Sequence, residues 1–266
     1  MRQGNACAKV PSGLRPKRRR TMISLTFSGN FTDTRRAVFA RAAARWDAVI
    51  ETGFAPITFE GGTLTGVRID AAITDIDGPQ GVLGQAGPTI LRPESELPLL
   101  GVMEFDRADV LALEEAGSFE DVILHEMAHV LGFGTLWARK GLIAGAGSVD
   151  PRFTGPAAAG EFARLDPAGG QGVPLANTGG VGTREGHWRE LVFGDELLTG
   201  FLSGSDRPLS AMSIASFADL GYEVDLGRAD PYALPNFREL ALKGVTEAVR
   251  RCDLCRMGRT EPVVLR

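Results

Sequence analysis

The 266-residue sequence has few of the features that mark several common classes of protein. It contains only three cysteines, so a disulfide framework is not expected. No apolar run reaches the roughly 20 residues of a membrane-spanning helix, so no transmembrane segment is expected. The formal net charge is only −4, which gives no indication of a nucleic-acid partner. Because 44% of the residues are hydrophobic, the chain can nevertheless bury a large core.

Histidine is scarce as well, and two of the three histidines lie in one short motif, His125-Glu126-Met127-Ala128-His129. The motif reads H-E-x-x-H. Two histidines four residues apart on a helix project from the same face, so both imidazoles can reach one metal ion. Glu126 is placed to act as general base on a metal-bound water, which is the arrangement of a zinc hydrolase. The competing interpretation is two unrelated histidines on a buried helix.

The segment around the motif has the signals of a helix of about four turns. Ser118, followed three residues later by Asp121, resembles a capping box at the helix start. Gly132 and Gly134 are suited to ending the helix, because glycine tolerates the left-handed conformation. An apolar face for burial is supplied by Val122, Ile123, Leu124, Met127, Val130 and Leu131.

A catalytic zinc site usually has three protein ligands, so the motif needs a third. Thr135 stands where a compact H-E-x-x-H-x-x-G-x-x-H motif would have its last histidine, although Gly132 is present to let the chain turn beneath the metal. His187 is the one histidine left, and we predict that it completes the site. The alternative is a zinc hydrolase of another clan, with a glutamate as third ligand; the candidates are Glu161, Glu185 and Glu190.

Three segments in order, HEMAHVLGFGTLW, the late GHWRE and LSAMSIASFADLGY, resemble the leishmanolysin-like branch of the metzincin metallopeptidases. The resemblance runs from about residue 23 to about residue 235. It implies a late third histidine, here His187, and it matches Met212 to the methionine of the Met-turn beneath the metal. It further implies one catalytic Zn²⁺ and an endopeptidase acting on a peptide or protein substrate. A secreted or cell-surface location is also implied, although no signal peptide is visible after the basic N-terminal residues.

Helical and strand patterns alternate without a βαβ rhythm, which predicts an α+β fold. Strands are expected at 21–28, at 65–77 and twice within 81–106, with residues 101–106 near the edge of the sheet. Helices are expected from Thr32 to Ile50, over the motif, at 155–165, near 190–200 and at 213–220. The metzincin resemblance implies a mixed twisted sheet with the motif helix. An irregular C-terminal subdomain that carries the third histidine and the Met-turn is expected to follow.

The expected organisation is a basic tail (1–20), an N-terminal catalytic subdomain (21–136), a C-terminal catalytic subdomain (137–245) and a tail (246–266). The last tail contains Cys252 and Cys255 as an isolated CxxC, interpreted as incidental. Cys7 as a ligand of an inactive precursor is a weak hypothesis. Two other functions remain open: a non-enzymatic zinc-bearing surface or adhesion protein on the same fold, and an intracellular redox or zinc protein built on the CxxC.

Overall fold

A computed structural model describes residues 21–79, 81–180, 182–201, 206–236 and 261–265. Its centre is a five-stranded mixed sheet with strand order β1-β4-β6-β5-β10. Strands β1, β4 and β6 are parallel, β5 is antiparallel to β6, and β10 is parallel to β5. The strands are β1 (Ile23–Ser28), β4 (Val67–Thr74), β5 (Gly84–Leu91), β6 (Pro98–Asp106) and β10 (Val263–Val264). Together with its helices, the sheet gives a fold of both helices and strands, and it is mixed, as the sequence predicts.

The prediction that residues 101–106 run near the sheet edge is wrong. They belong to β6, which lies between β4 and β5 and pairs with both. Seven of the nine residues of β6 are buried, as expected of a strand that is covered on both faces. The strand beyond it, β5, has the sequence GQAGPTIL. Glycine and proline weaken a strand in a sheet interior, and their presence in β5 suits a position near the edge.

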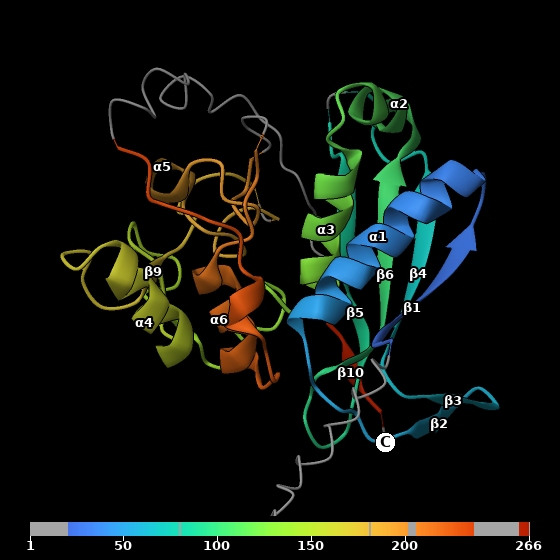
Figure 1. The fold of residues 1–266 in the computed structure, drawn as a ribbon, viewed down its shortest axis with the longest axis horizontal. Helices are drawn as coiled ribbons and strands as arrows, with labels where there is room; N and C mark the ends of the chain where they lie inside the picture. The colour runs from blue at the N-terminus through green and yellow to red at the C-terminus, as the bar shows by residue number, and fades with distance from the viewer. Residues whose placement is uncertain (1–20, 80, 181, 202–205, 237–260, 266) are drawn as a thin grey trace, which may run out of the picture.

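Three helices pack around the sheet, and α1 and α3 lie side by side across one of its faces (Figure 1). They are α1 (Asp33–Val49), α2 (Arg107–Glu115) and α3 (Phe119–Val130). Thr32 caps α1, since its Oγ1 accepts a hydrogen bond from Arg35 N at 3.2 Å. Trp46 of α1 is fully buried, and its Nε1 donates to Leu124 O of α3 at 3.0 Å. Helix α3, which carries the H-E-x-x-H motif, packs against both α1 and β5.

The predicted capping box at the start of α3 is not formed. Ser118 has helical backbone angles, φ −102° and ψ −3°, and its side chain makes no capping hydrogen bond. Instead, Ser118 N donates to Leu113 O at 3.0 Å, because α2 leads into α3 through a tight turn at Gly117. The helix has 12 residues and is shorter than the sequence suggests. It ends as predicted, with Gly132 at φ +110°.

After α3, most of the described residues form an irregular region beside the sheet, in which α4 (Pro156–Leu165) and α6 (Ala211–Leu220) pack together (Figure 1). One hydrophobic core joins this region to the sheet, since Trp46 of α1 packs on Phe217 of α6 with ring centroids 4.9 Å apart. Tyr222 OH also donates to Leu131 O at 2.9 Å. The remaining elements are β2 (Ile57–Phe59), β3 (Gly62–Leu64), β7 (Ile143–Ala144), β8 (Arg152–Phe153), α4 (Pro156–Leu165), β9 (Val173–Pro174), α5 (Glu190–Phe193), α6 (Ala211–Leu220) and η1 (Leu226–Arg228).

Several features expected from the sequence lie outside the described residues. They are the tail 1–20 with Cys7, and the CxxC of Cys252 and Cys255. Among the residues that the structure does describe, none forms a helix both long and apolar enough to cross a bilayer.

Candidate metal centre

The structure brings the three histidines together at the junction of the sheet and the irregular region. His125 and His129 lie one turn apart on α3, and His187 comes from the loop between β9 and α5. Each pair of Nε2 atoms is 3.0 Å apart. The three side chains are buried, with His129 and His187 completely enclosed. Within the described ranges, this is the only group of three or more candidate ligands placed to hold a metal ion.

The other ring nitrogen of each histidine is bonded to a backbone carbonyl. The acceptors are Leu197 O at 2.7 Å for His125, Phe133 O at 2.8 Å for His129 and Thr183 O at 3.0 Å for His187. A carbonyl oxygen can only accept, so Nδ1 must carry the proton in all three rings. Each neutral imidazole then directs the lone pair of Nε2 towards the other two. Such bonds fix the orientation and the tautomer of histidines that bind metals.

Three lone pairs that face one another at 3.0 Å repel unless a cation lies among them. Zinc ligands stand about 2.0–2.1 Å from the metal in a tetrahedron, which places neighbouring ligand atoms about 3.3 Å apart. The observed spacing is close to this value. The residues present therefore fit a metal ion held by three imidazoles.

Burial keeps these imidazoles neutral. It lowers the pKa of His125 to about 4 and that of His187 to about 3, in the second case with repulsion from His125 as an added cause. The pKa of His129 is also well below the usual value, because of burial and its two histidine neighbours. Since only a neutral imidazole binds a metal, the three rings are in the binding form at neutral pH.

Glu126 follows His125 on α3 and is completely buried. Its carboxylate lies against the first residue of β5: a Cβ atom at Gly84 would be 3.2 Å from Glu126 Cγ and 3.3 Å from Oε1. A larger residue at position 84 would therefore crowd the carboxylate. The absence of a side chain at Gly84 leaves room for Glu126 between the helix and the sheet.

Two glycines bring the loop of His187 against the end of α3. Gly134 has φ +71°, and a Cβ atom there would lie 2.2 Å from Gly186 O. The backbones of residues 134 and 186 thus approach more closely than any side chain would allow. Phe133, between Gly132 and Gly134, supplies the carbonyl that anchors His129. The segment 132–134 therefore ends the helix, orients one histidine and receives the loop of another.

The family model of leishmanolysin matches residues 73–236. The match spans more than half of the chain and includes all three histidines, Glu126 and Met212. The chain belongs to the leishmanolysin family. This is a family of zinc metallopeptidases, as the resemblance of the motifs implies. No curated protein matches the chain.

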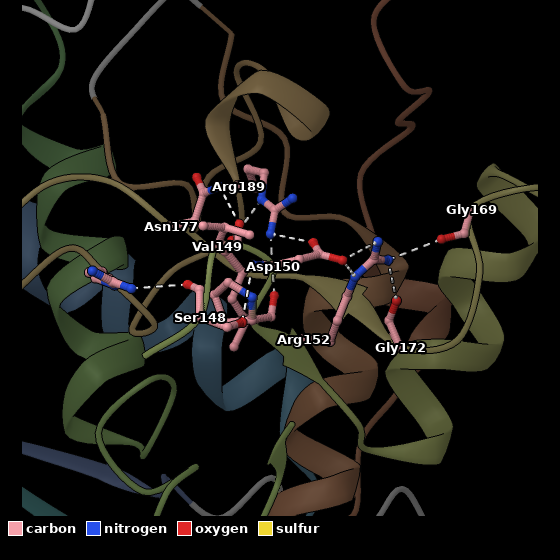
Figure 2. Close-up of polar contacts among 11 residues, drawn as sticks. Ser148, Val149, Asp150, Arg152, Gly169, Gly172, Asn177 and Arg189 are labelled. Atoms are coloured by element: carbon pink, nitrogen blue, oxygen red, sulfur yellow. Dashed lines mark hydrogen bonds and ion pairs between the residues drawn. The ribbon is translucent and has the colours of Figure 1, made fainter. Parts of the chain in front are cut away.

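In this member of the leishmanolysin family, the loop that carries His187 is held by a network of polar contacts (Figure 2). Arg189, two residues after His187, forms an ion pair with Asp150 at 2.9 Å and donates to Leu175 O at 2.8 Å. Asp150 also pairs with Arg152 at 3.1 Å. On the other side of His187, Glu185 Oε1 accepts from Gly147 N at 2.6 Å. Both flanks of the histidine are thus fixed by side chains on loops.

The glutamates considered as alternative ligands lie elsewhere. Glu161 forms an ion pair with Arg164 on α4, and Glu185 binds the backbone of Gly147. Across the described segments, Glu161, Glu185 and Glu190 do not join the group of ligand atoms around His125. The geometry thus favours a site of three histidines.

Met212 is fully buried in the first turn of α6, two residues after the capping residue Ser210. Sequence reasoning missed the groups that orient the histidines. Backbone carbonyls such as Leu197 O leave no trace in the residue type, and nothing in the sequence distinguishes Glu196 from the acidic Asp195 before it.

We expect Gly134→Ala to disrupt the site, because the methyl group would overlap Gly186 O and push the loop of His187 away. Gly141→Ala is a matched control: Gly141 has a similar φ of +66°, but a Cβ atom there meets no atom within 4 Å. Both variants incur the left-handed strain of about 1–2 kcal/mol. Only Gly134→Ala should also lose bound metal, measured by elemental analysis. Equal metal content in the two variants would contradict this role of Gly134.

The lowered histidine pKa values predict that the metal-free protein loses stability in mild acid. In the unfolded chain the imidazoles titrate near 6.5, whereas in the folded chain they stay neutral down to about 4. Below pH 6.5 the unfolded state therefore binds more protons, and the free energy of unfolding falls. Urea titrations of chelator-treated protein at pH 7.5, 6.5 and 5.5 measure this. A free energy of unfolding that does not change with pH would be the contrary result.

Proposed function

We propose that the protein is a zinc endopeptidase whose metal is held by Nε2 of His125, His129 and His187. The observation that carries the proposal is the set of three Nδ1 bonds to carbonyl oxygens, which turns three lone pairs towards one point. Imidazole ligands suit zinc, and three of them leave a position open for chemistry. Membership of a family of zinc metallopeptidases supports the same conclusion.

When bound, zinc acts as a Lewis acid that lowers the pKa of water to about 7 and polarises a carbonyl group. Glu126 is the proposed general base. Its carboxylate accepts a proton from the water whose oxygen attacks the scissile carbonyl carbon. It then gives this proton to the leaving amine as the C–N bond breaks. The support for this role is that Glu126 is a buried residue of α3 within the H-E-x-x-H motif.

The start of β5 is the proposed binding strand for the substrate. An extended peptide can add to a sheet edge through main-chain hydrogen bonds. Gly84, the first residue of β5, lies directly against Glu126. Among the described strands, only β10 pairs with the outer edge of β5, and it does so at Ile90 and Leu91, near the other end of the strand. The half of β5 nearer Glu126 therefore offers an edge to a peptide.

The metal site is tested by elemental analysis and chelation. Protein purified without chelator should contain about one zinc ion per chain, and peptide cleavage should stop on chelation and return with zinc. His187→Ala should lower zinc affinity by orders of magnitude, since two imidazoles hold the ion weakly. Glu161→Ala is the matched control and should keep zinc. Loss of zinc in the control together with retention in His187→Ala would establish the glutamate alternative instead.

The role of Glu126 is tested by Glu126→Gln. The change keeps the size of the side chain and the three histidines but removes the base. Zinc content should be unchanged while turnover falls by about 10²–10⁴-fold. Glu115→Gln, at the exposed end of α2, makes the same chemical change away from the site. Near-normal turnover in Glu126→Gln would show that another group accepts the proton. A wild-type protein that binds zinc but cleaves no peptide would be a non-enzymatic zinc protein.

A further inference from the structure

A buried carboxylate lies behind the histidine cluster. Glu196 is only 1% exposed and follows α5 in the chain. Its two oxygens accept four hydrogen bonds: from Leu198 N at 2.7 Å, from Ser210 N at 3.0 Å, from Ser210 Oγ at 2.7 Å and from Ser213 Oγ. Burying a carboxylate is costly unless hydrogen bonds compensate, and here both oxygens are provided with donors. A buried carboxylate with this many donors is therefore a candidate for a role in the neighbouring metal centre.

One of these hydrogen bonds leads to the metal centre through a single peptide unit. The N–H of the Leu197–Leu198 peptide donates to Glu196 Oε2 at 2.7 Å, and the carbonyl of the same peptide accepts from His125 Nδ1 at 2.7 Å. A negative charge at the N–H end polarises the peptide and makes its oxygen a stronger acceptor. A stronger acceptor at Nδ1–H makes Nε2 of the same imidazole more basic.

The anchoring bonds of the other two histidines differ from that of His125. His187 Nδ1 donates to Thr183 O at the longer distance of 3.0 Å. The N–H of that peptide, from Arg184, donates to Gly180 O, which is an uncharged carbonyl. The anchor of His129 is Phe133 O at 2.8 Å, on the same segment of chain as the histidine. His125 therefore has both the shortest anchoring bond and a charged group behind it.

A second path leads from Glu196 to the loop of His187. Trp188, the next residue after His187, donates from Nε1 to Ser213 Oγ at 2.7 Å, and this hydroxyl in turn donates to Glu196. Ser210 and Ser213 belong to the start of α6, so the carboxylate also faces the positive end of that helix. Burial raises the pKa of Glu196, while the hydrogen bonds from Ser213, Ser210 and Leu198 act in the opposite direction.

We propose that Glu196 is a positioning residue of the metal centre: through the Leu197–Leu198 peptide, its carboxylate orients His125 and strengthens Nε2 as a metal ligand. The inference rests on the proposed function, since it requires these histidines to bind zinc. The path through Ser213 and Trp188 has a structural role and secures the loop without acting on His125.

The test compares Glu196→Gln with Ser213→Ala in the full-length protein. Glu196→Gln keeps the shape and removes the charge. Zinc affinity, measured by competition with a chromophoric chelator, should fall about 10–100-fold. The visible absorption bands of the cobalt-substituted protein should shift. Ser213→Ala removes the link to Trp188 but leaves the bond from Leu198 N. It should lower the melting temperature, with zinc affinity and cobalt bands close to those of the wild type.

An NMR measurement on the wild type covers the case in which Glu196→Gln fails to fold. The Nδ1 proton of His125 in the zinc-loaded protein should resonate further downfield than those of His129 and His187, because its acceptor is polarised by a charge. Another order of the three resonances would overturn the inference, and so would unchanged zinc affinity and cobalt bands in folded Glu196→Gln. A wild-type protein that binds no zinc would instead refute the proposed function, so the two failures are distinguishable.

Discussion

The metal centre depends on three hydrogen bonds that point away from it. Each joins a histidine Nδ1 to a backbone carbonyl, and together they force three Nε2 lone pairs into contact distance. This arrangement is unfavourable without a cation, so the surrounding structure must hold it in place. The carbonyls come from three separate segments, near residues 133, 183 and 197. The conformation of those loops therefore decides the geometry of the site as much as the histidines do.

Because the third histidine lies late in the chain, many contacts are needed to hold its loop against α3. His125 and His129 are fixed by one helix, but His187 arrives from a loop far along the chain. Its approach requires the close contact of Gly134 with Gly186, the ion pair of Arg189 with Asp150, and the packing of Trp188 against Phe133 with ring centroids 5.1 Å apart. Each contact is individually modest, and together they replace the regular secondary structure that the loop lacks.

The sequence was sufficient to predict the three histidines that the structure brings together, but not the groups that orient them. The H-E-x-x-H spacing works because helical geometry is local, and His187 followed from the scarcity of histidine. The position of β6 was mispredicted, because strand order depends on pairings between distant residues rather than on local pattern. Ser118 failed as a cap for a related reason: the preceding helix α2 uses the same residue to end its own turn. Anchoring carbonyls such as Leu197 O are invisible in a sequence, since every residue has one.

Metal binding and folding are coupled in such a site. A metal ion bound by Nε2 of His125, His129 and His187 would join α3 to a loop that otherwise depends on side-chain contacts. The unfolded chain has no such preformed group of ligands, so the binding free energy adds to the stability of the folded state. Glu196 extends this coupling, because it connects the peptide that anchors His125 to the start of α6. Helix α6 is also part of the core that holds Trp46 and hence α3. The same core that buries the apolar residues therefore also sets the position of the ligands.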